Sequence, residues 1–319
     1  MNSTADTYTD NPARAQAAVA PTRANICAVV VTYQPDKELA DRLARIVPQV
    51  AAVVIVDNES KPEIRSNLVR ISREFGAALL QNEENLGVAT ALNQGFKWAR
   101  ENKFEWMLTL DQDSIPVPEM VQLLCAAYAD YDQRAKLAVI GSNYLPTEHA
   151  TEPEYDHTIG RSGSCWVEAH ETITSGSLIA LRALEELGPF EDDLFIDSVD
   201  HEFCLRARRR GWKVIISLPV GMRHFLGEPE RRRFLWKQVT PSHHSPLRQY
   251  YMARNRAIMC WRYFFFDPRW AVMLLRVLAL TPLFIVLYER QKWQKLAAFN
   301  LGLLHAAFGR RGKLNRTWA

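Results

Sequence analysis

The chain has 319 residues, of which 48% are apolar and 24% charged, and its formal net charge is +3. These values fit one α/β domain with a smaller appended segment, and so small a charge gives no argument for a nucleic-acid partner. The five cysteines form no C-x-x-C pair, which indicates reduced thiols in a cytoplasmic protein. Residues 1–25 are polar and lack an apolar run, so we expect a disordered segment rather than a secretory signal.

Three short apolar runs in the first third of the chain predict buried parallel strands. They are Ile26 to Thr32, Val53 to Val56 and Trp106 to Leu110. Helical patterns over residues 37–50, 62–75 and 89–102 separate or precede these strands. The alternation predicts an α/β fold with a doubly wound, mostly parallel sheet flanked by helices.

The alternation weakens after Asp113. We expect helices over residues 117–131, 197–211 and 242–266, strands over 138–142 and 213–217, and a strand-like stretch over 166–181 with a break at 175–177. This pattern divides the chain into a catalytic domain over residues 26–240 and a C-terminal helical region over residues 241–319.

Residues 270–288 are almost all apolar and are interrupted by Arg276 and Pro282. A membrane-spanning helix needs about 20 apolar residues, and a central arginine is costly there. We therefore expect an amphipathic helix that lies on the membrane or packs on the enzyme, rather than one that spans the membrane. A helical hairpin buried against the domain or in a dimer, a possible homo-oligomer, is the alternative. Basic residues that favour an anionic surface follow. They are Arg290, Lys292, Lys295, Arg310, Arg311, Lys313 and Arg316.

Two carboxylates at the end of the third predicted strand are the strongest chemical signal. Asp111 and Asp113 are two residues apart on an extended segment, so their side chains leave the same face. They repel each other unless a cation joins them, and hard oxygen ligands favour Mg²⁺ or Mn²⁺ with a substrate diphosphate. A solvated acidic turn before Pro116 is the alternative. The buried strand favours the metal site, because ligands of open α/β sheets bind at the carboxyl ends of strands.

Polar residues also follow the other predicted strands. Asp57 can accept hydrogen bonds from a base or a ribose, although Asn58 and Ser60 make a turn cap an equal alternative. Asn85 and Gly87 open a predicted helix whose N-terminus favours phosphates. The structural alternative there is an Asn cap with tight packing of helix against sheet.

Asp197, Asp200 and Glu202 gather at the start of another predicted helix. Acids in a first helical turn complement the macrodipole, and Asp197 can cap the helix. The functional alternative is that one of them is a general base, and the sequence leaves open which acid faces the cleft. His224 is a candidate metal ligand only if it meets Asp111 and Asp113 in space.

These motifs, in this order, resemble family 2 glycosyltransferases. The D-Q-D-S form is most similar to bacterial rhamnosyltransferases that build O-antigen or other cell-surface polysaccharide, and the resemblance runs from about Cys27 to about Asn255. The residues that carry it are Thr32-Tyr33, Val56-Asp57-Asn58, the run from Asn85-Leu86-Gly87 to Asn93, and Leu110-Asp111-Gln112-Asp113-Ser114.

The resemblance implies a GT-A fold, a divalent cation (Mg²⁺ or Mn²⁺), an inverting mechanism and dTDP-L-rhamnose as donor. It implies a nucleotide-sugar pocket, with Asp113, Asp111 and His224 near the metal. The pocket residues would be Thr32, Tyr33, Asp57, Asn58, Asn85, Gly87, Asp111 and Gln112.

The resemblance also implies the remaining roles. Gly176 and Ser177 would lie near the acceptor, and Arg254-Asn255 matches a recurrent pair near the active site. Asp200 matches the second acid of the family's Glu-Asp pair, the usual base, and Asp197 is the other candidate. A glycan acceptor linked to a lipid, and peripheral contact with the inner face of the cell membrane, fit the apolar and basic C-terminal region.

Two other classes of protein remain as alternatives. A sugar nucleotidyltransferase would normally have a Gly-rich basic loop after the first strand, where this chain has Tyr33-Gln34-Pro35-Asp36. A Rossmann dehydrogenase is disfavoured because no G-x-G-x-x-G follows any strand. A glycosyltransferase with another donor, or a non-catalytic peripheral membrane protein with a degenerate GT-A fold, also stays open.

Overall fold

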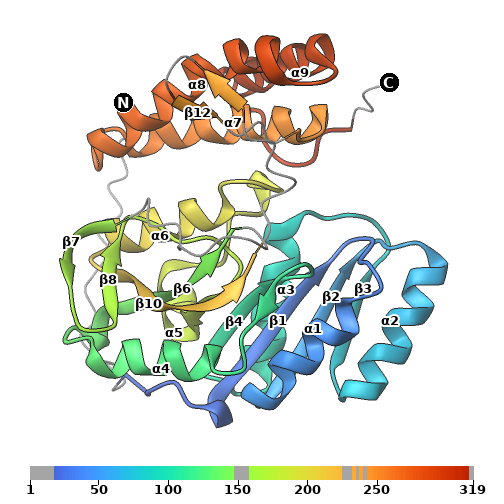
Figure 1. The fold of residues 1–319 in the computed structure, drawn as a ribbon, viewed down its shortest axis with the longest axis vertical. Helices are drawn as coiled ribbons and strands as arrows, with labels where there is room; N and C mark the ends of the chain where they lie inside the picture. The colour runs from blue at the N-terminus through green and yellow to red at the C-terminus, as the bar shows by residue number, and fades with distance from the viewer. Residues whose placement is uncertain (1–17, 147–157, 225–231, 235–236, 240–242, 316–319) are drawn as a thin grey trace, which may run out of the picture.

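The computed structural model describes residues 18–146, 158–224, 232–234, 237–239 and 243–315. Figure 1 shows a sheet with helices against it, and a layer of C-terminal helices beyond the upper edge of the sheet. The described strands are β1 (Ile26–Thr32), β2 (Ala52–Asn58), β3 (Ala78–Asn82), β4 (Trp106–Asp111), β5 (Ile115–Pro116), β6 (Leu137–Leu145), β7 (Thr158–Ser162), β8 (Trp166–Ala169), β9 (Ser177–Ala180), β10 (Lys213–Arg223), β11 (Arg232–Phe234) and β12 (Lys237–Val239).

The helices follow the predicted pattern closely in the first half of the chain. Those described are α1 (Leu39–Ile46), α2 (Pro62–Phe75), α3 (Val88–Glu101), α4 (Met120–Asp130), α5 (Leu181–Leu187), α6 (Val199–Arg209), α7 (Pro246–Tyr263), α8 (Pro268–Tyr288) and α9 (Lys292–Ala307). The sequence patterns did not predict β3, α5 or a separate α9. The strand predicted over residues 213–217 continues to Arg223, because it pairs with β6 along its length.

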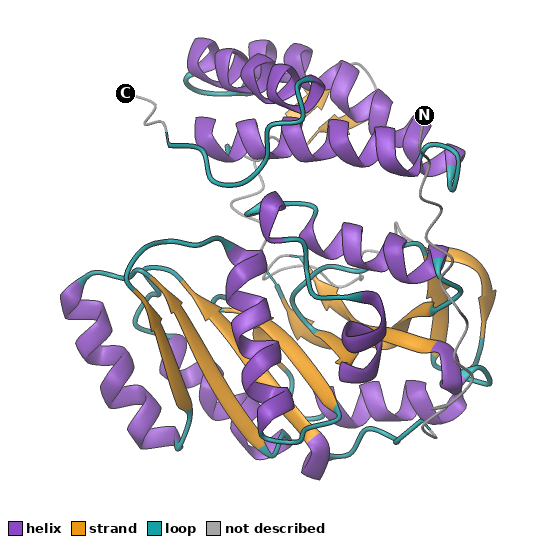
Figure 2. Cartoon of the chain, turned by 180° about the vertical axis from the view of Figure 1, so that it is seen from behind, coloured by secondary structure: helices purple, strands orange, loops and turns teal. Residues whose placement is uncertain are grey.

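The sheet has the order β3-β2-β1-β4-β9-β6-β10-β8-β7. The first four strands in this order are parallel, as predicted. Beyond β4 the sheet is mixed, because β9 runs antiparallel to both β4 and β6 while β10 is parallel to β6. The predicted α/β class with flanking helices is confirmed, and Figure 2 shows helices on both sides of the sheet.

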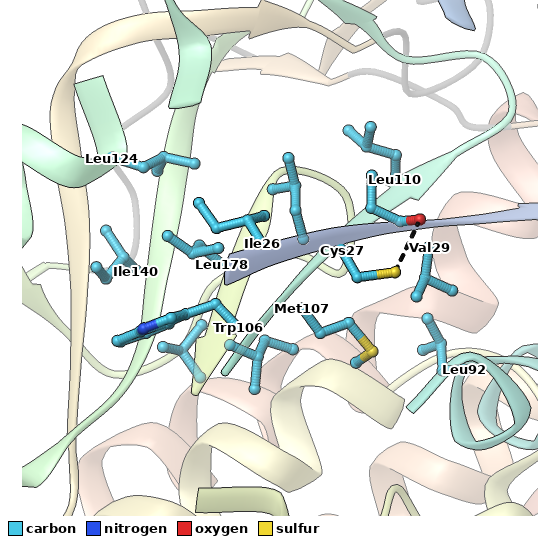
Figure 3. Packing of buried hydrophobic residues seen from close by; sticks show 14 of the residues in the cluster. Ile26, Cys27, Val29, Leu92, Trp106, Met107, Leu110, Leu124, Ile140 and Leu178 are labelled. Atoms are coloured by element: carbon cyan, nitrogen blue, oxygen red, sulfur yellow. Dashed lines mark hydrogen bonds between the residues drawn. The ribbon is translucent and has the colours of Figure 1, made fainter. Parts of the chain in front are cut away.

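The core explains why the first strand reads as one continuous apolar run. Every residue of β1 is buried, because helices cover both faces of the central strands. Figure 3 shows Ile26, Cys27 and Val29 of β1 among side chains from β4 and from flanking helices. Gly95 of α3 packs so closely on β1 that an added Cβ would lie 2.4 Å from Val29 Cγ1.

The segment before β1 is ordered where it is described. The indole Nε1 of Trp106 donates a hydrogen bond to the Val19 carbonyl at 3.0 Å, and Pro21 is buried. The expectation of disorder up to residue 25 therefore fails for residues 18–25, and residues 1–17 lie outside the described part.

The C-terminal region consists of α7 packed against α9 and α8. Gly302 of α9 lies against α7 so closely that an added Cβ would meet the Tyr250 carbonyl oxygen at 2.5 Å. By length and composition, α8 is long and apolar enough to cross a membrane, with a mean hydropathy of 2.2. Much of its apolar surface is uncovered, since Leu275, Leu280 and Leu283 are exposed.

Candidate functional site

A cavity of about 500 Å³ lies at the carboxyl ends of the parallel strands. Its walls come from the ends of β1, β2 and β4, from residues 85–88 and 173–174, from the segment 195–201, from His224 and from helix α7. The arrowheads of β1 and β2 point toward the C-terminal helices in Figure 1, so this edge of the sheet faces the helical layer. The position agrees with the rule for ligands of open α/β sheets.

Asp111, Asp113 and His224 meet in this cavity as a group that fits a divalent cation. One ligand atom from each lies within 4.8 Å of the other two. His224 Nε2 lies 3.7 Å from Asp111 Oδ2, and His224 Nδ1 lies 3.7 Å from Asp113 Oδ1. Asp113 Oδ1 is buried and has no hydrogen-bonding partner among the described residues, as expected for an oxygen that a cation would satisfy. Two carboxylates and an imidazole suit Mn²⁺ or Mg²⁺.

Two serines hold this group in place from behind. Ser114 Oγ lies 2.9 Å from His224 Nδ1 and 2.6 Å from Ser175 Oγ, which in turn accepts a hydrogen bond from the Asp111 amide. Contacts of this kind orient a ligating histidine and select its free nitrogen. Here they leave His224 Nε2 facing Asp111.

The electrostatic surroundings of Asp111 oppose its ionisation when no cation is bound. Burial raises the pKa of Asp111 to about 6, and the nearby carboxylates of Asp113 and Asp200 add to the increase. His224 acts in the opposite direction. A carboxylic acid that resists ionisation alone but is ionised beside a cation is typical of a metal site.

Tyr33 and Gln112 join two walls of the cavity. The Gln112 side chain accepts a hydrogen bond from the Tyr33 amide at 2.7 Å and donates one to the Tyr33 carbonyl at 3.1 Å. The Tyr33 ring is half exposed and also borders a second cavity of about 620 Å³, next to Arg65. Tyr33 and Gln112 therefore both line the cavity, and their contact with a nucleotide stays a prediction.

Thr32 and Asp57 lie behind this surface rather than on it. Both side chains are fully buried, and Asp57 accepts hydrogen bonds from the Thr32 hydroxyl and from the Ser60 hydroxyl and amide. Arg65 Nε lies 3.8 Å from Asp57. Asp57 therefore acts as a turn cap, the structural alternative, because its carboxylate accepts hydrogen bonds from Ser60 and fixes the loop that carries Asn58. Asn58 itself borders the cavity and donates a hydrogen bond to the Gly87 carbonyl.

Asn85 and Gly87 line the cavity, but the helix that they open does not offer its N-terminus to a phosphate. The Phe195 carbonyl accepts hydrogen bonds from the amides of Val88 and Ala89, the first residues of α3. Gly87 has φ +89°, and an added Cβ would lie 2.5 Å from the same carbonyl oxygen. The glycine is therefore needed for the close approach of the segment 195–198, and the predicted phosphate site at this helix is corrected.

Segment 195–198 carries Asp197, one of the two candidate bases, in a strained conformation, and it leads into α6, which carries Asp200. Phe195, Asp197 and Ser198 all have φ near +65°, which is uncommon for residues with a side chain. Asn255 of α7 is fully buried and donates hydrogen bonds to the carbonyls of Leu194, Ile196 and Asp197. The Arg254-Asn255 pair thus supports the site from behind and does not enter the cavity.

Asp197 and Asp200 both line the cavity, but their surroundings differ. Asp200 Oδ2 accepts hydrogen bonds from the Thr174 amide and hydroxyl, and its Oδ1 accepts one from the His201 amide. Asp197 Oδ1 lies 3.3 Å from Arg248, whereas Oδ2 is buried without a described partner. Burial raises the pKa of Asp197, and Arg248 opposes the increase.

Gly176 and Ser177, expected beside the acceptor, do not border this cavity. Ser177 is buried in β9 and its hydroxyl donates to the Ile173 carbonyl at 2.6 Å. Gly176 packs against Met222, where an added Cβ would lie 2.8 Å from the sulfur. The structure instead brings Ile173 and Thr174, from the same loop, to the cavity wall.

Sequence reasoning did not find the residues that helix α7 contributes. Arg248 and Arg256 line the cavity together with His201 of α6. No motif marked the two arginines. Their helix follows the acids by about 50 residues, and only tertiary packing brings it to the cavity that Asp197 and Asp200 line. The predicted motif around His224 continues into residues 225–227, which lie outside the described residues.

Two curated glycosyltransferases are similar in sequence to this chain. It is 30% identical over 243 residues to the dTDP-rhamnosyl transferase RfbF of Shigella flexneri, covering 74% of this chain and 79% of that protein. It is 33% identical over 94 residues to an uncharacterized glycosyltransferase of Haemophilus influenzae, covering 28% of this chain and 30% of that protein.

Solved structures show the same fold at low sequence identity. The mannosyltransferase PcManGT from Pyrobaculum calidifontis, in complex with GDP-Man and Mn²⁺, has a TM-score of 0.55 at 17% identity and covers 92% of this chain and 89% of its own. S. aureus TarS 1-349, in complex with UDP-GlcNAc, has a TM-score of 0.52 at 16% identity and covers 90% and 92%. The fold is that of GT-A transferases. Residues 27–187 match glycosyl transferase family 2, and the chain belongs to this family.

Proposed function

We propose that this protein is an inverting rhamnosyltransferase, which moves L-rhamnose from dTDP-L-rhamnose to a hydroxyl of a lipid-linked glycan at the inner face of the cell membrane. One observation carries the proposal: Asp111, Asp113 and His224 share a cavity with Asp197 and Asp200. A cation site and a carboxylate base side by side are what sugar transfer from a nucleotide requires. The similarity to a dTDP-rhamnosyl transferase supports the choice of donor.

The donor is proposed to lie across the ends of β1, β2 and β4. Tyr33 and Asn58 would contact the nucleoside, with the second cavity beside Tyr33 taking the base. Asp111, Asp113 and His224 would hold Mg²⁺ or Mn²⁺, which supplies positive charge for the leaving diphosphate. The buried contacts of Asp57 would keep this wall rigid.

Asp200 is proposed as the base that takes the proton of the attacking acceptor hydroxyl. Hydrogen bonds from Thr174 and His201 hold its carboxylate at the cavity wall. Asp197 is the second candidate, because burial raises its pKa toward neutrality, which favours a proton acceptor. The hydroxyl oxygen would attack the anomeric carbon as the bond to the diphosphate breaks, inverting the configuration.

The donor assignment is tested by incubating the purified protein with Mn²⁺ and a panel of nucleotide sugars. We expect release of dTDP from dTDP-L-rhamnose to exceed release from the other donors. Release of UDP or GDP from another sugar instead would keep the glycosyltransferase and change the donor. A complete lack of hydrolysis together with a lack of Mn²⁺ binding would favour a non-catalytic protein with a degenerate site.

The base is tested by comparing Asp200→Asn with Asp197→Asn. A positioned base contributes about 10²–10⁴-fold, so Asp200→Asn should reduce kcat by at least 100-fold. Its Mn²⁺ and dTDP affinity, measured by calorimetry, should stay unchanged. If Asp197→Asn alone causes the loss, Asp197 is the base and the carboxylate of Asp200 is structural.

Peripheral membrane contact is proposed for the outer face of α8. Exposed apolar side chains cover this helix, and two exposed tryptophans, Trp261 and Trp293, lie on the helices packed against it. Three of the basic residues that were expected to face an anionic surface instead form ion pairs within the protein. They are Lys295 with Glu289, Arg311 with Glu191, and Lys313 with Glu84. Among the described residues, Arg290, Lys292 and Arg310 are exposed and would face the headgroups.

A further inference from the structure

Two guanidinium groups of α7 enter the cavity, although no known motif contains them. Arg248 lies in the first turn of the helix and Arg256 eight residues later, about 12 Å along the helix axis. Both line the same cavity as the candidate metal ligands and the candidate bases. Two like charges in one cavity repel each other, which predicts an anion between them or beside them.

Arg256 has neither a hydrogen bond nor an ion pair with any residue in the described part of the chain. Arg254, which is buried on the same helix, donates hydrogen bonds to the carbonyls of Asp193, Leu194 and Gly312. Arg262, on the same helix, forms a two-pronged ion pair with Glu191. Arg256 is therefore the exception on its helix: a partly buried guanidinium that lines the cavity and has no described partner for its donors.

Arg256 and Asp111 line different walls of the cavity, because Arg256 belongs to α7 and Asp111 ends β4. Burial lowers the pKa of Arg256, and the carboxylates of Asp197 and Glu171 oppose this decrease. The guanidinium of Arg248 opposes the increase in the pKa of Asp111. Arg248, on the same helix, contacts Asp197, one of the two candidate bases. Burial and the two arginines lower the pKa of His244 to about 4, so its imidazole is neutral at neutral pH and adds no charge to this side.

We propose that Arg256, assisted by Arg248, binds the phosphate or diphosphate group that joins the acceptor glycan to its lipid. The proposal rests on the proposed function and names the acceptor group that the site selects. An anion bound by α7 would lie at the helical wall of the cavity, whereas the donor's diphosphate is proposed to lie at the end of β4. Helix α7 also packs against α8, so a lipid attached to this phosphate would leave the cavity beside the exposed apolar face of α8.

The test measures binding rather than turnover. Calorimetry of the full chain, with dTDP and Mn²⁺ saturating the donor site, would use farnesyl diphosphate as the probe. We expect wild-type protein to bind the probe at least ten-fold more tightly than inorganic pyrophosphate or farnesol. Arg256→Gln should weaken binding of farnesyl diphosphate at least ten-fold and leave dTDP·Mn²⁺ binding unchanged. Arg210→Gln, which changes an exposed arginine at the end of α6, is the matched control and should bind like wild type.

Three results would overturn the proposal. Weaker dTDP·Mn²⁺ binding in Arg256→Gln would assign the arginine to the donor. Equal binding of farnesol and farnesyl diphosphate would exclude recognition of the phosphate, and equal binding of pyrophosphate would exclude the lipid as its source. A protein that binds farnesyl diphosphate through Arg256 but does not use dTDP-L-rhamnose would retain this subsite while the proposed donor fails.

Discussion

The carboxylate of Asp111 is controlled by its immediate neighbours. Its position at the end of β4 removes part of its surface from water and sets it near Asp113 and Asp200, and this raises its pKa to about 6. The neutral acid is therefore favoured in the folded protein at a pH where an unfolded chain would ionise it. The consequence is a site that must lose a proton before it can bind a cation at mildly acidic pH.

Because Asp111 must lose its proton to bind a cation, we expect cation binding to depend on pH. We expect Mn²⁺ affinity to be nearly constant above pH 7 and to fall about ten-fold for each unit below pH 6, as Asp111 becomes protonated. Titration calorimetry at pH 5 to 8 measures it. In the same experiment Asp113→Asn should weaken binding at every pH. Affinity that stays constant down to pH 5 would show that Asp111 is not a ligand.

The raised pKa of Asp111 also makes the free energy of unfolding of the cation-free protein depend on pH. A raised pKa means that the folded state holds this proton more tightly than the unfolded state does. The stabilisation that the proton contributes to the folded state is therefore fully present below about pH 4. It is lost as pH rises through about 6. Addition of Mn²⁺ at neutral pH should recover stability, because the cation replaces the proton.

At the scale of elements, the site depends on the contact between the N-terminus of α3 and the segment 195–198. Gly87 allows this contact, because its φ of +89° and its lack of a side chain let the Phe195 carbonyl approach the first amides of the helix. Asn255 holds the same segment from α7. Two helices distant in sequence thus fix the conformation that carries Asp197 and Asp200.

Gly87→Ala should therefore damage both stability and activity. Gly76→Ala is the matched control, because Gly76 also has a positive φ of +62° but an added Cβ meets nothing within 4 Å. Gly76→Ala should cost about 1 kcal/mol of unfolding free energy from backbone strain alone. Gly87→Ala should cost more than that and reduce kcat, since segment 195–198 must move. Denaturant unfolding and kinetics measure both, and equal effects of the two variants would argue against the contact.

At the scale of the whole molecule, the C-terminal helices form one unit with the catalytic domain. Removal of α8 and α9 would uncover α7, which provides Arg248, Arg256 and the Asn255 support. Truncation before α8 is therefore a poor test of membrane contact. Substitution on the exposed face of α8 keeps the packing intact.

The membrane contact predicts that Leu280→Glu combined with Leu283→Glu reduces binding to liposomes that contain anionic lipid. Both side chains are more than 40% exposed, so the fold should tolerate the change. We expect flotation of wild type with the vesicles and loss of most of it in the double variant, because charge on this face is costly in the interface. Val19→Glu, which also changes an exposed apolar residue, is the control. Undiminished flotation would move the anchor elsewhere, and dimerisation of the wild type in solution would favour a second copy as the cover of α8.

The sequence alone determined three of the four parallel strands and the position of the candidate metal ligands Asp111 and Asp113. Local rules decide these features: continuous apolar runs require burial on both faces, and parallel strands bring their carboxyl ends to one edge. β3 escaped prediction because its residues are only partly buried at the edge of the sheet and carry a weak pattern.

The tertiary structure alone decided which polar residues face the ligand. It turned Asp57 into a buried loop support, occupied the N-terminus of α3 with the Phe195 carbonyl, and brought Arg248 and Arg256 into the cavity. The physical reason is the range of the interactions. A strand-end aspartate is placed by its own strand, whereas a side chain on α7 is placed by the packing of helices far apart in the sequence, which no local pattern encodes.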